Sequence, residues 1–521
     1  MKRNYSVLQV KYGSHIFPCF MALTVFVVIL FSLSSCNTGS KGRYKFQPES
    51  MHWLQFRGPN ASGIAPEDAD PPIHFSADTN LLWKTEIPSG WSSPCIVNDK
   101  IFLTGFDEQD SLLNVFAINR KDGEIMWMDS IIPNGFYDMH SINSYANPTI
   151  ASDGKRIYAE FMNYGLTAYD LDGHKIWEYP HEMIGSYYGG AGSPVLADSL
   201  VIIRIGVEEK YSLIALNCLN GDSTWLYRPG DDEAYLSSNS TPVIDDSLLY
   251  LYASDAVIAL NMKNRSLAWS IPVSGNAVAT PVISEADLYI NTYSQLGEEK
   301  VMGENIPFEE LIARIDQNNN GMAEQNEFPE DMPVFTRPEI VDIDRSSMFF
   351  RDDRTFALTD SNGDGSINKA EWDEVWKMLE EFMIKHGMTA ISLEGAGERP
   401  ADDFKWKINE DSPETPSPLI IGDEILFIKN GGIVTMINRD SGNVALHERL
   451  GAPGAYVSSP LLAGNRIYTC SFNGTVTVLS VDDFSVLAQN KLKEKIGASP
   501  VAVDDVLYVR TDKHLYAFRD Q

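Results

Sequence analysis

The feature that most constrains the fold of this chain is a strand-opening motif that occurs eight times. In each copy small residues stand beside a proline and an apolar run follows, as in SSPCIV and ATPVIS. The eight prolines are Pro94, Pro148, Pro194, Pro242, Pro281, Pro418, Pro460 and Pro500. A repeat of this kind is typical of a protein built from copies of one supersecondary unit.

Each copy continues through the same succession of strands. A polar turn leads to a second apolar strand such as KIFLTG, and segments such as VFAINRKDGEIMW contain two further strands around an Asp-Gly turn. The fourth strand carries Trp127, Trp177, Trp225 or Trp269 in the first four copies. We therefore predict an all-β fold, an eight-bladed β-propeller of four-stranded antiparallel blades. Small residues would line its axis, and tryptophans would fill the space between blades.

The two ends of the repeat are complementary. The eighth copy stops at residues 514–521 without a tryptophan strand, whereas NLLWKTEIP, residues 80–88, supplies such a strand ahead of the first copy. If that strand completes the last blade, the ring closes and no sheet edge stays open there. A solenoid, the alternative architecture, does not explain these complementary ends.

The repeat resembles the quinoprotein-type (PQQ-like) β-propeller family, which includes the propeller lipoprotein of bacterial outer-membrane assembly. Besides the strands, WLQFRGPNASG at residues 53–63 is similar to the leader of exported bacterial members. The resemblance covers nearly all of residues 53–521 except one insertion. Two blades depart from the pattern: Leu446 replaces a tryptophan in the sixth, and VTVLSVDDFSVLA lacks the glycine turn in the seventh.

The resemblance implies one alternative function, a PQQ- and calcium-dependent quinoprotein oxidoreductase acting on alcohols or sugars. Enzymes of this family commonly stack the quinone between a tryptophan and a disulfide of adjacent cysteines. This chain has no adjacent cysteines, and Cys95, Cys218 and Cys470 are far apart in the sequence. The tryptophans recur once per blade, as packing residues do. We therefore do not expect PQQ, and we favour a protein that is not an enzyme.

The first residues are typical of a secretory signal. Basic residues precede an apolar run over residues 16–33, and the Leu-Ser-Ser-Cys sequence that ends at Cys36 resembles the lipobox of bacterial lipoproteins. This resemblance implies cleavage before Cys36, lipidation of its sulfur, and a location at the bacterial cell envelope as a periplasmic or outer-membrane lipoprotein. The alternative is a single transmembrane anchor, because 18 apolar residues approach the minimum for a span.

The charge of the chain argues against nucleic acid as a partner, and much of the negative charge lies in one segment. A net charge of −31 argues against nucleic-acid binding, which needs clustered Lys and Arg. The β pattern stops over residues 295–387, which contain 22 acidic and 9 basic residues. Such a density of carboxylates either repels itself or gathers around cations.

One stretch of this segment, DSNGDGSINKAE at residues 360–371, has the spacing of a 12-residue calcium loop of the EF-hand type. Gly365 stands at position 6, where the chain must turn, and Ile367 at position 8 can pair with a partner loop. The expected ligands are Asp360, Asn362, Asp364, Ser366, Asn368 and Glu371. The exit helix that follows would place Trp372, Val375, Trp376, Leu379, Phe382 and Met383 on one face.

A second stretch, DQNNNGMAEQNE at residues 316–327, repeats this spacing. The expected ligands are Asp316, Asn318, Asn320, Met322, Glu324 and Glu327. Its entering helix would carry Phe308, Leu311, Ile312 and Ile315 on one face. We expect weaker binding here, because Asn replaces Asp at positions 3 and 5 and Pro329 shortens the exit helix.

The sequence thus predicts a signal peptide (1–35), a tether (36–50), a propeller (51–294 and 388–521) and an EF-hand pair inserted in blade 5 (295–387). We expect two Ca²⁺ sites, the loop at 360–371 being the stronger, that fold the insertion rather than act as a switch. The expected function is binding or scaffolding of a protein or glycan at the propeller face or the insertion.

Overall fold

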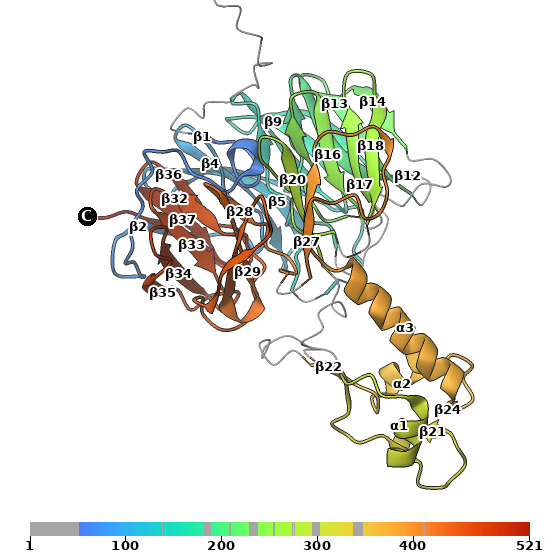
Figure 1. The fold of residues 1–521 in the computed structure, drawn as a ribbon. Helices are drawn as coiled ribbons and strands as arrows, with labels where there is room; N and C mark the ends of the chain where they lie inside the picture. The colour runs from blue at the N-terminus through green and yellow to red at the C-terminus, as the bar shows by residue number, and fades with distance from the viewer. Residues whose placement is uncertain are drawn as a thin grey trace, which may run out of the picture. The chain divides into compact units, whose positions relative to one another are not determined.

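The computed structural model describes most of the chain after the first 51 residues. The described residues are 52–521 without 138, 141, 182–188, 208–209, 229–237, 254–255, 274, 276, 294–302, 337–346 and 410–411, and without the side chains of 207, 210 and 381–385. Their strands form eight sheets of four or five strands, which are the blades in Figure 1, and two smaller two-stranded sheets. The predicted all-β, eight-bladed propeller of antiparallel four-stranded sheets is therefore confirmed.

The strands of the first four blades follow one another along the chain, with two additions. Blade 1 contains β1 (His52–Trp53), β3 (Cys95–Val97), β4 (Lys100–Asp107), β5 (Leu112–Asn119) and β6 (Ile125–Ile131). Blade 2 contains β7 (Ala151–Ser152), β8 (Arg156–Phe161), β9 (Gly165–Asp170) and β10 (Lys175–Pro180). Blade 3 contains β11 (Val195–Ala197), β12 (Leu200–Val207), β13 (Lys210–Asn217) and β14 (Ser223–Tyr227). Blade 4 contains β15 (Val243–Asp245), β16 (Leu248–Tyr252), β17 (Ala256–Asn261), β18 (Ser266–Pro272) and β26 (Gly397–Glu398).

The remaining four blades include the interrupted one and the one that closes the ring. Blade 5 contains β19 (Val282–Ile283), β20 (Asp287–Thr292), β25 (Gly387–Ser392) and β27 (Trp406–Ile408). Blade 6 contains β28 (Leu419–Ile421), β29 (Glu424–Lys429), β30 (Ile433–Asn438) and β31 (Val444–Arg449). Blade 7 contains β32 (Leu461–Ala463), β33 (Arg466–Cys470), β34 (Thr475–Ser480) and β35 (Val486–Lys491). Blade 8 contains β36 (Val501–Val503), β37 (Val506–Arg510), β38 (His514–Phe518) and β2 (Leu81–Glu86).

Blade 8 combines the two ends of the repeat. The strand β2 pairs with β38 in antiparallel register, so that Trp83 lies opposite Ala517. This is the closing strand that the sequence predicts. The edge of the last blade is therefore covered by a strand from the start of the propeller, and the ring is closed.

The leader segment lies against the inner strands of several blades. Its strand β1 pairs with β3 of blade 1, and Ile64 forms a parallel bridge with Leu462 of blade 7. Between them, the buried guanidinium of Arg57 donates hydrogen bonds to the carbonyls of Ser417 and Pro418 at the start of blade 6. The leader thus connects blades that are far apart in the sequence.

A ring of hydroxyl groups joins all eight blades at the start of their inner strands. In each blade a buried main-chain N–H donates to the side-chain hydroxyl of the equivalent residue in the next blade, over 2.8 to 3.4 Å. The eight residues are Ser93, Thr149, Ser193, Thr241, Thr280, Ser417, Ser459 and Ser499. The position therefore requires a hydroxyl group as well as small size.

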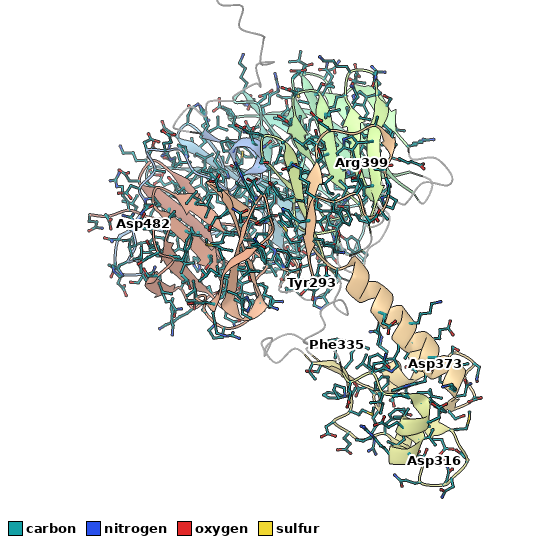
Figure 2. All side chains as sticks on the ribbon, in the orientation of Figure 1. Tyr293, Asp316, Phe335, Asp373, Arg399 and Asp482 are labelled. Carbon is teal, nitrogen blue, oxygen red and sulfur yellow. The ribbon has the colours of Figure 1, made fainter. Side chains whose placement is uncertain are left out.

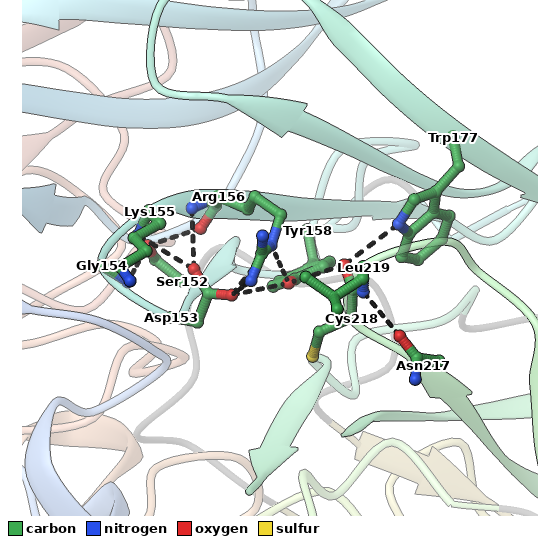
Figure 3. Close-up of polar contacts among 10 residues, drawn as sticks. All are labelled: Ser152, Asp153, Gly154, Lys155, Arg156, Tyr158, Trp177, Asn217, Cys218 and Leu219. Atoms are coloured by element: carbon green, nitrogen blue, oxygen red, sulfur yellow. Dashed lines mark hydrogen bonds and ion pairs between the residues drawn. The ribbon is translucent and has the colours of Figure 1, made fainter. Parts of the chain in front are cut away.

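Where a blade has the recurring tryptophan, the indole lies at the periphery, and in most cases it donates a hydrogen bond to the following blade. Figure 3 shows the seam between blades 2 and 3, where the indole N–H of Trp177 donates to the carbonyl of Cys218 over 3.1 Å. The hydroxyl of Tyr158 donates to the same carbonyl over 3.2 Å, and a Cβ added to Gly221 would overlap the Trp177 ring. Within its own blade Trp177 lies opposite Ala168, a residue small enough to leave room for the indole. The tryptophan is thus a packing residue, as its once-per-blade spacing predicts.

The structure explains the two blades that depart from this pattern. In blade 6 Leu446, the residue that replaces the tryptophan, lies opposite Met436. In blade 7 Phe484 takes the place of the turn glycine and has a positive φ of 56°. Leu446 and Phe484 pack against the same hydrophobic cluster. In blade 7 the equivalent residue is Ala488, opposite Val478. The next blade has no turn to receive a tryptophan there, because its outer strand β2 comes from the other end of the propeller.

The acidic insertion leaves blade 5 between its second and third strands. The strand before the insertion, β20, pairs with the strand after it, β25, and Thr292 lies opposite Gly387. The sheet of blade 5 is therefore continuous despite the insertion. The described insertion contains the helices α1 (Phe308–Ile315), α2 (Asp353–Thr359) and α3 (Lys369–Lys385), the one-turn helix η3 (Gln325–Glu327), and the short strands β21 (Ala323–Glu324), β22 (Pro333–Thr336), β23 (Ser347–Phe349) and β24 (Ser366–Ile367). No helix within the described residues is long and apolar enough to cross a membrane.

The insertion has a hydrophobic cluster of its own. Trp372 and Trp376 of α3 are buried in it, together with Phe308 and Leu311 of α1 and Phe350. Ile315 and Leu379 are also buried there, and Ile312 and Val375 pack against its edge. The predicted apolar faces of α1 and α3 are therefore the faces that pack together, except for Phe382 and Met383, whose side chains lie outside those described.

Candidate metal centre

The carboxylate of Asp360 organises the start of the loop at 360–371. Its Oδ1 accepts hydrogen bonds from the N–H groups of Gly363 and Asp364, and its Oδ2 accepts one from Gly365 at 2.8 Å. Gly363 and Gly365 both have positive φ angles, 71° and 88°, which glycine adopts without strain. The chain therefore wraps tightly around one buried carboxylate.

Glu371 holds the other end of the same loop. Its Oε2 accepts the N–H of Asn368 at 3.0 Å, and Asn368 Oδ1 accepts the N–H of Glu371 in return, which is a capping box at the start of α3. Its Oε1 accepts the N–H of Asn362 at 3.1 Å. Because the Glu371 side chain is only 5% exposed, this carboxylate is buried between the two ends of the loop.

Asn362 and Asp364 stand at alternate positions of the loop, and each accepts hydrogen bonds from the residue two positions further along. Asn362 Oδ1 accepts the N–H of Asp364, and Asp364 Oδ1 accepts both the N–H and the hydroxyl of Ser366. These hydrogen bonds lower the pKa of Asp364 below its usual range. The oxygens at positions 1, 3, 5 and 12 are therefore held in place by the loop's own N–H groups.

The loop at 316–327 repeats most of this network, except that its last carboxylate accepts the N–H of position 2 instead of position 3. Asp316 accepts N–H hydrogen bonds from Asn319, Asn320 and Gly321, and Glu327 accepts those of Gln317 and Glu324. Further along, Asn318 Oδ1 accepts the N–H of Asn320, and Asn320 Oδ1 accepts the N–H of Met322. Figure 2 shows Asp316 on this loop. Two sequences that differ at eight of their twelve positions thus adopt closely similar conformations.

The two loops differ at position 9. In the loop at 316–327 the carboxylate of Glu324 accepts hydrogen bonds from the side-chain amides of Asn318 and Asn320, at 2.6 and 2.7 Å. In the other loop this position is Asn368, which caps α3. Each loop therefore contains three carboxylates, although they stand at different positions.

The loops are joined through a short antiparallel pair. The strands β21 and β24 place Ala323 opposite Ile367, the residues at position 8 of each loop. The sequence predicts this pairing for Ile367. It does not predict α2, the helix of seven residues that enters the loop at 360–371, although Phe356 of that helix is part of the buried cluster. The first loop exits through η3, which ends before Pro329, as expected.

The donor set of these loops suits a hard cation that takes neutral oxygens as well as carboxylates. Among the described residues no group of three or more His, Cys, Asp or Glu side chains is arranged to hold a metal ion by itself. A cation in either loop would therefore depend on Asn side-chain oxygens and main-chain carbonyls in addition to carboxylates. Such mixed oxygen shells of six to eight ligands are characteristic of Ca²⁺ sites.

His140 lies in a turn in which its Nδ1 accepts the N–H of Ile142, and its carbonyl accepts the N–H of Asn143. Its described contacts are thus local. Cys36, the predicted lipidation site, lies outside the described residues.

Comparisons with known proteins address the fold more than the site. No curated protein matches this sequence. Among solved structures, BamB from Moraxella catarrhalis is 10% identical, with a TM-score of 0.36 over 85% of this chain and 98% of that one. A europium-containing methanol dehydrogenase is 11% identical, with a TM-score of 0.46 over 89% and 90% of the two chains. The quinohemoprotein alcohol dehydrogenase ADHIIG from Pseudomonas putida HK5 is 12% identical, with a TM-score of 0.48 over 90% and 80%. We base no conclusion on these distant likenesses.

A family model gives a firmer assignment. It is the model of PQQ-like repeats described as outer membrane protein assembly factor BamB, and it matches residues 150–328 and 339–521. These residues make up well over half of the sequence, and they form the greater part of the propeller described above. The chain therefore belongs to the PQQ-like β-propeller family of the outer membrane protein assembly factor BamB.

Proposed function

We propose that this protein is a calcium-binding, lipid-anchored β-propeller that acts as a non-catalytic binding or scaffold protein at the bacterial cell envelope. The observation that carries the calcium assignment is the shared hydrogen-bond network of the two loops. In both, the carboxylate at position 1 accepts the N–H groups of positions 4, 5 and 6. The insertion would be an EF-hand pair over residues 295–387, joined by Ala323 and Ile367.

The loop at 360–371 is proposed as the stronger Ca²⁺ site. Both loops contribute three carboxylates, so formal charge does not separate them. The two loops differ in the helix that follows each of them. Glu371 stands in the first turn of α3, which has 17 residues, whereas Glu327 is the last residue of η3, which has three. Because the last ligand of a calcium loop must be held firmly to offer both its oxygens, the longer helix favours tighter binding.

A structural role for the ion is supported by the way α3 joins the propeller. Only His386 separates α3 from β25, and this histidine is fully buried, with its ring centroid 5.4 Å from that of Tyr293. The hydroxyl of Thr292 donates to the carbonyl of Gly387 at 2.9 Å. Ca²⁺ at Glu371 would thus stabilise the helix that leads directly into the third strand of blade 5, without any need for a switch.

Calorimetric titration of the whole protein with Ca²⁺ tests this assignment. We expect two sites in the native protein, one in Glu371→Ala, one in Glu327→Ala and none in the double variant. Glu374→Ala is the matched control, because Glu374 is an exposed acidic residue of the same helix. An unchanged stoichiometry in Glu371→Ala would contradict the site.

The scaffold role rests on the family. Its description concerns outer membrane protein assembly, which is a function of protein partners, and a closed ring of blades offers such partners a broad rigid face. Affinity capture from the native envelope, with and without chelator, would identify a partner and show whether it needs Ca²⁺. Reconstitution with PQQ distinguishes the alternative: a bound chromophore with dye-linked alcohol oxidation would contradict a non-catalytic role.

The lipid anchor is proposed from the cysteine that follows the signal. Mass spectrometry of the mature N-terminus should find an acylated Cys36, and Cys36→Ser should abolish acylation and release the protein from membranes. If the Cys36→Ser protein stays in the membrane fraction and keeps its first 35 residues, an uncleaved transmembrane anchor replaces the proposal.

A further inference from the structure

A small internal cavity lies at the seam of blades 2, 3 and 4, apart from the calcium loops. It is lined by Glu160 of β8, Arg204 of β12 and Ser240 ahead of β15, together with apolar side chains that include Met162 and Leu251. The cavity leaves about 10 Å³ for the centre of a water molecule. This is the room that a single water needs.

The polar groups of this cavity are deeply buried. Glu160 is 2% exposed, Ser240 1% and Arg204 9%. The Nε of Arg204 and the hydroxyl of Ser240 have no hydrogen-bond partner among the described residues. A buried polar atom without a partner costs about 1–3 kcal/mol, so two of them at one small cavity favour the binding of a small polar molecule there.

The arginine at the equivalent position of blade 8 is held by main-chain carbonyls, although its Nε, like that of Arg204, has no hydrogen-bond partner among the described residues. In blade 3 the first residue of the inner strand, Val195, pairs with Ile202, and Arg204 follows two residues later. In blade 8 the first residue of the inner strand, Val501, pairs with Tyr508, and Arg510 follows two residues later. Arg510 donates from Nη1 to the carbonyl of Ser92 and from Nη2 to that of Pro88. Arg204 makes no such bond to a described residue and instead lies over the ring of Tyr211, 5.3 Å from its centroid.

The charges around the cavity narrow the choice of ligand. The positive charge of Arg204 repels a cation. The carboxyl group of Glu160, whose Oε1 lies 3.8 Å from His181 Nε2, can accept a hydrogen bond whether or not it carries a proton. A water molecule can accept hydrogen bonds from Arg204 Nε and the Ser240 hydroxyl and donate to Glu160. It matches both the size of the cavity and its mixture of donors and acceptors.

We propose that this cavity is a binding site for one ordered water molecule, which bridges Glu160, Arg204 and Ser240 and so links blades 2, 3 and 4. Each of the three residues comes from a different blade, so one water molecule would connect three blades through hydrogen bonds. The site involves neither the calcium loops nor the proposed partner face, and it does not depend on the proposed function.

A crystal structure at about 1.5 Å resolution tests the proposal directly. We expect one density peak within hydrogen-bonding distance of Arg204 Nε, the Ser240 hydroxyl and Glu160. In Gly192→Ala the added Cβ would lie 3.2 Å from the carbonyl oxygen of Ser240 and 3.7 Å from Arg204 Nη2. That methyl group takes the place of the water, so the peak should disappear.

Ser458→Ala is the matched control. Ser458 occupies in blade 7 the position that Ser240 occupies in blade 4 and is equally buried, but its hydroxyl donates to the carbonyl of Cys470 at 3.1 Å, and the peak beside Ser240 should remain. Magnetic relaxation dispersion in solution should count one long-lived water fewer in Gly192→Ala than in the native protein or in Ser458→Ala. An empty cavity beside well-ordered Arg204 and Ser240, or an anomalous peak there after a bromide soak, would overturn the proposal.

Discussion

The main-chain N–H of Ser499 donates a hydrogen bond to the hydroxyl of Ser93 over 3.1 Å, across 406 residues of sequence. This contact closes the ring of eight hydroxyl groups around the propeller axis. Both residues are buried, so neither group can turn to solvent if the other is removed. The ring therefore complements the closure that β2 provides at the outer edge of blade 8.

Removing this hydroxyl should destabilise the whole propeller. We expect Ser93→Ala to lower the free energy of unfolding by about 1–3 kcal/mol, because it leaves the N–H of Ser499 buried without a partner. Ser93→Thr should cost less, since Thr149, Thr241 and Thr280 already serve in the ring. Urea unfolding followed by fluorescence measures both. Equal losses in the two variants would show that size rather than the hydroxyl matters.

The close packing of a turn glycine against the tryptophan of the preceding blade should make a glycine-to-alanine substitution there unusually destabilising. A Cβ at Gly123 would lie 2.7 Å from the Trp83 ring and 2.6 Å from the hydroxyl of Thr85 on the same strand, and Gly123 has a φ of +79°. Gly154 has a similar φ of +82° but open space around it. Gly154→Ala should cost about 1–2 kcal/mol from backbone strain alone, and Gly123→Ala clearly more. Thermal unfolding compares them, and equal costs would remove the tryptophan contact from the explanation.

Acid should loosen the closure of blade 8 through Glu494. Although burial disfavours its charge, hydrogen bonds from Thr511, His514 and Tyr516 lower the pKa of Glu494 from 4.5 to about 2. The stability that this carboxylate contributes is present above pH 4.5 and is lost as the pH falls toward 2. In Glu494→Gln that part of the acid transition should be absent.

Unfolding at several values between pH 2 and pH 6 measures this effect. Glu67→Gln is the control, because Glu67 is exposed. If Glu494→Gln and the native protein lose stability in parallel over this range, Glu494 does not contribute to the acid sensitivity.

Glu160 should produce the opposite pH dependence. Burial raises its pKa from 4.5 to about 8, against the attraction of Arg204. The folded state therefore keeps the proton to a higher pH than the unfolded state does. The stability that this proton contributes is complete below pH 4.5 and is lost as the pH rises through 8. Glu160→Gln, which stays neutral, should flatten the decline between pH 5 and pH 8. An unchanged slope would mean that Glu160 is ionised throughout, as an ion pair with Arg204.

Much of the propeller follows from local patterns in the sequence. The eight strand openings, the turn glycines and the tryptophans recur because every blade meets the same neighbours, and periodic surroundings select periodic residues. For the same reason the turns of the two acidic loops follow from their spacing, since each loop spans 12 consecutive positions and its backbone is set by local hydrogen bonds. The helix α2 escaped this reasoning because its seven residues carry few periodic apolar positions.

Contacts between blades could not be predicted in this way. In the second blade the proline motif aligns Asn147 with Ser93, yet the structure uses Thr149, which follows Pro148, in the hydroxyl ring. The choice depends on which side chain reaches the next blade, 44 residues further along. Similarly, the loss of a tryptophan at Leu446 becomes intelligible only beside Phe484 of the neighbouring blade.

The sequence by itself determined the number of blades, the closing strand and the form of the two acidic loops, because each depends on spacing along the chain. Only the tertiary structure decided that the small residues at the axis form a closed ring of hydroxyl groups. It also decided that Glu160, Arg204 and Ser240 surround one cavity. These relationships join residues from different blades, and their energies come from burial and from hydrogen bonds that exist only after the ring has closed.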